Sequence, residues 1–110
     1  MTDAALRARH RLAKHGQQTL SQAQKRSAAA NIRCETEYVE GVVANVILNR
    51  AADADLVILG RRGEGANWAG PQLGSVLESI VRYSPTPVLA VQAEIRPLTR
   101  IVVAFDGSER

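Results

Sequence analysis

Residues 55–60 of this 110-residue chain read Asp55-Leu56-Val57-Ile58-Leu59-Gly60. A short, continuous apolar run that ends in glycine is typical of a strand buried on both faces of a parallel sheet. A second such run, Val88-Leu89-Ala90-Val91, follows the helix-breaking segment Ser84-Pro85-Thr86-Pro87. Between the two runs, four apolar residues recur at helical spacing: Val76, Leu77, Ile80 and Val81. The centre of the sequence therefore predicts a strand, a helix and a second strand.

Upstream of this unit, the hydrophobic pattern predicts two helices and one more strand. Residues 32–40 alternate with a period of two, as expected for a strand with one solvated face. Apolar residues then recur at helical spacing from Val42 to Ala51. Residues 4–30 place apolar and basic side chains on opposite sides of a helical wheel, so we predict one long amphipathic helix there.

Downstream of the central unit, residues 93–100 are predicted to form a linker that contains Pro97. The apolar run Ile101-Val102-Val103-Ala104-Phe105 predicts a further strand, which leads into Asp106-Gly107-Ser108. Strands that alternate with helices imply right-handed crossovers and a mostly parallel sheet. We therefore predict an α/β fold with three layers, in which helices cover both faces of the sheet.

Composition restricts the class of protein. Apolar residues make up 45% of the chain and charged residues 23%, the balance of an ordinary globular domain. No stretch approaches the roughly 18 to 20 apolar residues of a membrane span, and the first residues lack the pattern of a secretory signal. Cys34 is the only cysteine, so no internal disulfide can form, and we expect a reducing, cytoplasmic location. One cysteine and two histidines are too few ligands for structural zinc, so no metal site is expected.

Positive charge is concentrated in the first third of the chain. Residues 1–33 hold seven basic residues and one acidic residue, a net charge of +6. Such asymmetry can indicate contact with nucleic acid or a membrane. However, aromatic residues are only 4% of the chain, and the apolar side of the predicted helix is mostly alanine. We therefore interpret the basic side as a solvated helix face and expect neither a nucleic-acid partner nor a membrane partner.

A glycine-rich loop, residues 60–75, connects the first central strand to the following helix. It contains five of the eight glycines of the chain: Gly60, Gly63, Gly65, Gly70 and Gly74. Glycine lets the backbone approach a bound group closely, and the free N–H groups at a helix start, near Ser75 and Val76, suit a phosphate. Ser75 is also a candidate N-cap. On the residues alone, a surface loop whose glycines only make turns stays an equal alternative. Neither a P-loop nor a Rossmann motif is present, because no lysine follows Lys25 and the glycine spacing differs.

The spacing of Gly60, Gly63, Gly74 and Ser75 resembles the nucleotide-binding loop of the universal stress protein family. In that family the loop has Gly, two residues, Gly, nine residues and then Gly-Ser or Gly-Thr. Here ten residues, 64–73, separate Gly63 from Gly74. The segments around the two central strands are also similar to the family's fourth and fifth strands. The resemblance covers most of residues 32–92.

This resemblance implies a Rossmann-like fold, a role in the stress response and binding of ATP or ADP, with Mg²⁺ or Mn²⁺ accompanying the nucleotide. The nucleotide-binding residues that it implies are Gly60, Arg61, Arg62, Gly63, Gly74, Ser75, Val76 and Asp106. It implies no catalytic residue and no enzymatic activity beyond slow, incidental ATP hydrolysis.

The order of segments departs from the family. The run from Ile101 to Glu109 is similar to the family's first strand, whose final aspartate contacts adenine, yet it comes last here. The chain resembles the back part of one domain (1–92), a linker (93–100) and the opening strand of a following domain (101–110), and is incomplete relative to the family. We therefore expect a homodimer, with residues 87–92 as its edge, or association with the rest of a tandem protein. The alternative is an interaction or dimerisation fragment that binds no nucleotide.

Overall fold

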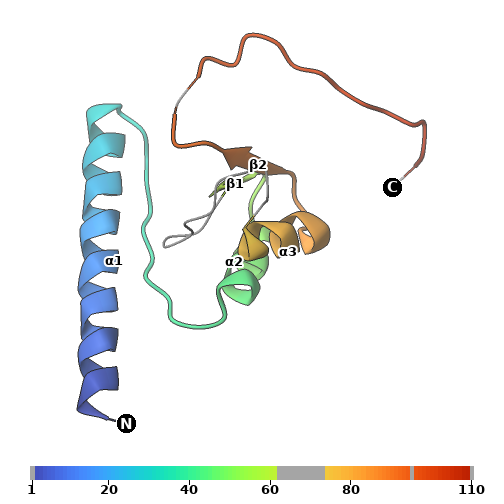
Figure 1. Cartoon of the computed structure of the whole chain (residues 1–110). Coiled ribbons are helices and arrows are strands. Elements are labelled where there is room, and N and C mark those ends of the chain that lie inside the picture. Colours follow the sequence, from blue (N-terminus) through green and yellow to red (C-terminus); the bar gives the residue numbers. More distant parts are fainter. Residues whose placement is uncertain (1, 62–73, 95, 110) are drawn as a thin grey trace. The chain divides into compact units, whose positions relative to one another are not determined.

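The computed structural model describes residues 2–61, 74–94 and 96–109 (Figure 1). It contains, in chain order, α1 (Asp3–Ala29), α2 (Val43–Ala51), β1 (Val57–Gly60), α3 (Ser75–Tyr83) and β2 (Val88–Val91). The chain divides into two compact units, Met1–Val42 and Val43–Arg110. The sequence predictions for these three helices and two strands are confirmed to within one or two residues.

The first unit is built on α1, whose two ends are both capped. The Thr2 hydroxyl accepts a hydrogen bond from the Ala5 amide at 3.1 Å, as an N-cap residue should. At the other end, Asn31 adopts a left-handed conformation with φ of 56°. The Asn31 amide donates to the Ala28 carbonyl at 3.0 Å and the Ile32 amide to the Ser27 carbonyl at 2.8 Å. This pair of bonds is a Schellman motif, which turns the chain away from the helix.

Residues 32–40, which we call the strap, run back along α1. Gln24 on the helix donates to the Thr36 hydroxyl at 3.2 Å. Nearer the N-terminus, Arg9 forms a bidentate ion pair with Glu40, in which Nε donates to Oε1 at 3.2 Å and Nη2 donates to Oε2. The predicted strand over 32–40 is therefore wrong. A strand needs a neighbouring backbone with which to pair, whereas the strap is held by side chains of α1.

The second unit is a small parallel sheet covered by helices. β1 pairs with β2 in parallel, with Val57 opposite Val88 and Gly60 opposite Val91. The pairing extends beyond the strands, because the Val57 amide donates to the Pro87 carbonyl at 2.9 Å and the Arg61 amide to the Val91 carbonyl at 3.0 Å. α3 forms the crossover between the strands and packs against α2 (Figure 1). The α/β class is thereby confirmed.

The core of the second unit is formed by residues of α2 and α3. Ala51 of α2 and Leu77 and Ile80 of α3 are its buried apolar side chains among the described residues. Thr86 joins α2 to the start of β2, since its hydroxyl donates to the Ala51 carbonyl at 2.7 Å. On β1, half-buried residues such as Val57 alternate with exposed ones such as Ile58, which is 60% exposed, whereas on β2 only Val88 is half-buried. The prediction that both strands are buried on both faces is therefore wrong, because the described elements cover these strands only in part. The three-layer arrangement, in which helices cover both faces of the sheet, stays a prediction.

Residues 101–105 form no strand in the structure, contrary to the sequence prediction. Their apolar side chains are 80% to 94% exposed, and among the described residues no strand pairs with them. A strand forms only when its backbone pairs with a neighbouring strand, and residues 101–105 have no such pairing among the described residues, so the apolar pattern alone is not enough here. The division into a domain, a linker and a following strand stays a prediction. In the described part of the chain, no helix has the length and apolar character needed to cross a membrane.

Candidate functional site

The carboxyl ends of β1 and β2 lie side by side, and the glycine-rich loop begins at the end of β1 and ends at the start of α3. The Arg61 amide donates to the Val91 carbonyl, and the Arg61 carbonyl accepts a hydrogen bond from the Gly74 amide at 3.0 Å. Residues 61 and 74 are therefore joined directly, although twelve residues separate them in the sequence. This bond places the start of α3 next to the end of β1. It brings together both ends of the predicted phosphate-binding segment.

The N-terminus of α3 presents backbone donors at this point. Gly74 is the N-cap, with φ of −63° and ψ of 149°, and no side chain caps the helix. The first helical bond runs from the Glu78 amide to the Gly74 carbonyl at 3.0 Å. The amides of Ser75, Val76 and Leu77 precede it, and none of the described residues accepts a hydrogen bond from them. Such amides carry the positive end of the helix dipole.

The structure corrects one predicted role. Ser75 is the first residue of α3 rather than its N-cap. The reason lies in Gly74, whose extended ψ and bond to Arg61 place the helix boundary one residue earlier than Ser75 would. Gly74 is buried against the end of β1, whereas Ser75 is exposed. The Ser75 hydroxyl is thus accessible beside the helix amides.

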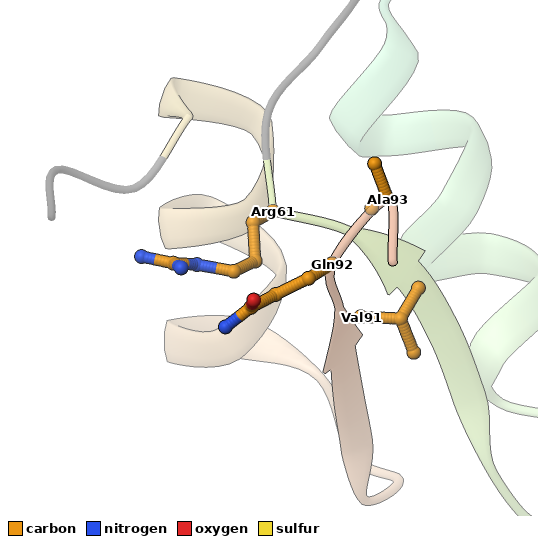
Figure 2. A pocket seen from close by; sticks show the side chains of 5 residues that line it. Arg61, Val91, Gln92 and Ala93 are labelled. Carbon is orange, nitrogen blue, oxygen red and sulfur yellow. The ribbon is translucent and has the colours of Figure 1, made fainter. Parts of the chain in front are cut away.

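A pocket of about 500 Å³ lies at the strand ends. The described residues that line it are Gly60, Arg61, Val91, Gln92 and Ala93. Figure 2 shows the side chains of Arg61 and Gln92 extending in the same direction, away from the side chain of Val91. Arg61 and Gln92 are thus the described lining residues with polar side chains, one cationic and one an amide.

The structure brings five of the eight predicted nucleotide-binding residues to this place: Gly60, Arg61, Gly74, Ser75 and Val76. Arg62 and Gly63 lie outside the described residues. Gln92 was not predicted from the sequence. The signal that could have found it is its position directly after β2, one residue beyond the pairing of Gly60 with Val91.

Asp106 is held by the turn in which it lies. Its Oδ1 accepts hydrogen bonds from the Ser108 amide at 2.8 Å and the Ser108 hydroxyl at 2.6 Å. These bonds stabilise the carboxylate and lower the pKa of Asp106 below its ordinary value. Within the described residues, no hydrogen bond links Asp106 to β1 or α3. Nucleotide binding by Asp106, which the interpretation as a tandem protein assigns to a different site from the loop, stays a prediction.

Metal ligands do not gather in the described part of the chain. No three side chains of the His, Cys, Asp or Glu type lie close enough there to hold an ion. Both histidines, His10 and His15, are on α1 in the first unit. The donors at the strand ends are amides, a guanidinium and a hydroxyl, a set that can hydrogen-bond an anion.

Comparison with known proteins gives a family match. The sequence model of the universal stress protein family matches residues 1–92. A universal stress protein of Synechocystis sp. is 35% identical over 68 residues, which are 62% of this chain and 24% of that protein. One from Mycobacterium tuberculosis is 33% identical over 103 residues, 90% of this chain and 32% of that protein. The universal stress protein YxiE of Bacillus subtilis is 33% identical over 86 residues, 76% of this chain and 57% of that protein.

The chain thus spans between about a quarter and somewhat more than half of the length of these relatives. No solved structure gives a significant match.

Proposed function

This chain belongs to the universal stress protein family, and from that premise we propose that it acts in the stress response by binding ATP or ADP. The phosphates lie between the end of β1 and the start of α3. The observation that carries this proposal is the 3.0 Å hydrogen bond from the Gly74 amide to the Arg61 carbonyl. It holds the helix amides next to the end of β1, at the two ends of the glycine-rich loop.

Each residue at the strand ends has a separate role in this proposal. The amides of Ser75 and Val76 donate to phosphate oxygens, because they have no carbonyl partner among the described residues and carry the positive end of the helix dipole. The exposed Ser75 hydroxyl adds a further donor. Arg61 supplies positive charge, and Gly60 and Gly74 keep the surface free of side chains. Arg62 and Gly63 belong to the same proposed segment, and Asp106 belongs to the adenine side of a site.

The proposal is for binding without turnover. Mg²⁺ or Mn²⁺ enters with the nucleotide, on the phosphate oxygens that these hard cations prefer. Neither histidine, His10 nor His15, lies near the glycine-rich loop in the sequence, so we assign no general base for hydrolysis. ATP hydrolysis is at most slow and incidental.

Calorimetric titration with Mg-ATP tests the proposal through a matched pair of serines. Ser75→Ala removes the hydroxyl at the helix start, and Ser79→Ala makes the same change one turn further along α3. We expect Ser75→Ala to weaken binding about tenfold to a hundredfold, the value of one hydrogen bond to a charged group, and Ser79→Ala to leave it unchanged. Gly74→Val, which adds a side chain at the buried N-cap, should weaken binding further. Equal heats for all four proteins would contradict the proposal.

A second candidate function, an interaction or dimerisation module, is favoured by the open edges of the sheet. The sheet has two strands in the described part of the chain. Val57 and Arg61 point their amides toward β2, so the alternate residues Ile58 and Gly60 point theirs to the opposite side. By the same alternation, Val88 and Ala90 point outward from β2. Such edges pair readily with a further strand, either of a second copy or of the rest of a tandem protein.

A further inference from the structure

The ends of the two strands place Arg61 and Gln92 next to each other. Gly60 lies opposite Val91, so the following residues, Arg61 and Gln92, continue the same register. The 3.0 Å bond from the Arg61 amide to the Val91 carbonyl holds this register one residue beyond β1. Opposed residues of a strand pair direct their side chains to the same face. Figure 2 accordingly shows both side chains extending in one direction.

The chemistry of this pair differs from that of the remaining pocket lining. Arg61 contributes a permanent positive charge, and the Gln92 amide contributes two N–H donors and one acceptor. The other described lining residues, Gly60, Val91 and Ala93, carry no polar side chain. Gln92 is exposed, so a ligand in the pocket can reach its amide. A cation with an adjacent neutral donor suits an anionic group.

We infer that Gln92 is a phosphate-binding residue of this pocket, whose Nε2 donates to an oxygen of a phosphate that also contacts the Arg61 guanidinium. The inference rests on the proposed function and adds to it a residue from the second strand. It also makes the effect of Gln92 specific to phosphate. Arg61 and Gln92 should not increase the affinity for a nucleoside without phosphate, whereas they should increase the affinity for ADP and ATP.

The test compares Gln92→Leu and Gln92→Glu with a matched control. Leucine keeps the approximate size of glutamine but has no donor, and glutamate keeps the shape but adds a negative charge. The control, Gln18→Glu, makes the same change of charge at an exposed position of α1. Binding of ATP, ADP, adenosine and inorganic tripolyphosphate to the full chain is measured by calorimetry, and circular dichroism verifies that each variant is folded.

We expect Gln92→Leu to weaken binding of ATP, ADP and tripolyphosphate about tenfold. Gln92→Glu should weaken it more, because like charges then meet in the pocket. Adenosine binding should not change, and Gln18→Glu should behave as the unmodified chain. If the Gln92 variants weaken binding only of the ligands that carry phosphate, Gln92 contacts the ligand and does not merely support the structure.

Two results would overturn the inference alone. One is unchanged binding of ATP and ADP to both Gln92 variants while the unmodified chain binds them. The other is an equal loss for adenosine and ATP, which would indicate a structural role for Gln92. If the unmodified chain bound none of the four ligands, the proposed function would fail and the inference with it.

Discussion

Gly16 is the position in α1 where a missing side chain allows close packing. A Cβ built on Gly16 would lie 2.7 Å from Cδ2 and Cε2 of the Tyr38 ring, closer than carbon atoms approach in folded proteins. Glycine costs a helix about 1 kcal/mol relative to alanine. The packing of the strap on α1 thus depends on a residue that weakens the helix itself.

This conflict predicts that the effect of Gly16→Ala depends on Tyr38. In a Tyr38→Ala background, Gly16→Ala should stabilise α1 by about 0.5 to 1 kcal/mol, because the ring is gone. With Tyr38 present, the gain should be smaller or reversed, since the strap has to move away. Urea unfolding of the four proteins, followed by helical circular dichroism, measures the coupling. Equal effects of Gly16→Ala in both backgrounds would contradict the packing described here.

The ion pair between Arg9 and Glu40 holds the same strap at its far end. Its hydrogen bond from Arg9 is the main cause that lowers the pKa of Glu40 below the ordinary value of 4.5. A carboxylate with a lowered pKa contributes stability that is present at neutral pH and is lost as the pH falls through that pKa. Because both side chains are largely exposed, the contribution is small.

The helices and strands that could be predicted are those whose pattern lies within a short stretch of sequence. The long helix, α2 and α3 follow from a repeat of apolar residues, and Pro85 ends the last of them before β2. β1 and β2 follow from short apolar runs between breakers. The strap and residues 101–105 carry strand-like patterns as well, but strand formation depends on a partner that the pattern cannot supply.

The residues of the candidate site divide in the same way, into those visible as a pattern along the chain and those that depend on contacts between segments. Gly60, Gly74 and Ser75 could be predicted because their spacing is visible along the chain. Gln92 was missed, because its position directly after the second strand places it beside Arg61 only through the pairing of β1 with β2. The N-cap role also depended on tertiary structure, since the bond between Arg61 and Gly74 sets the boundary of α3.

Thr86 links α2 to β2, and its loss should destabilise the second unit. The Thr86 hydroxyl donates to the Ala51 carbonyl at 2.7 Å and lies 3.2 Å from the Ala54 carbonyl. Thr86→Val keeps the shape but removes the donor beside Ala51, which is 1% exposed. We expect a loss of about 1 to 2 kcal/mol in the free energy of unfolding, measured by urea denaturation. Thr99→Val, in the exposed segment after β2, is the control and should change little. A similar loss in both variants would contradict this role of Thr86.

For the molecule as a whole, the small core and the open sheet favour association. The described residues bury three apolar side chains in the second unit, and Ile58, Leu89 and Val91 are exposed on its strands. The chain also spans only part of the length of its relatives. A second copy or the rest of a longer protein would cover this surface.

Proline substitutions test which edge of the sheet takes part. Ala90→Pro removes an amide that points outward from β2, and Ile58→Pro removes one that points outward from β1, while neither breaks the bonds between the strands. We propose a homodimer through β2, so light scattering after gel filtration should give a dimer mass for the unmodified chain and for Ile58→Pro, and a monomer mass for Ala90→Pro. A monodisperse monomer of the unmodified chain, or loss of the dimer only in Ile58→Pro, would refute this arrangement.

The claim on which the functional proposal depends is that a phosphate group sits at the start of α3, against the end of β1. Backbone amide chemical shifts of the ¹⁵N-labelled chain, recorded during a titration with Mg-ADP, test it most directly. The proposal predicts that the largest shift changes occur at Gly60 and Arg61 and at residues 74–77. No change at high ADP concentration, or changes confined to α1, would contradict it.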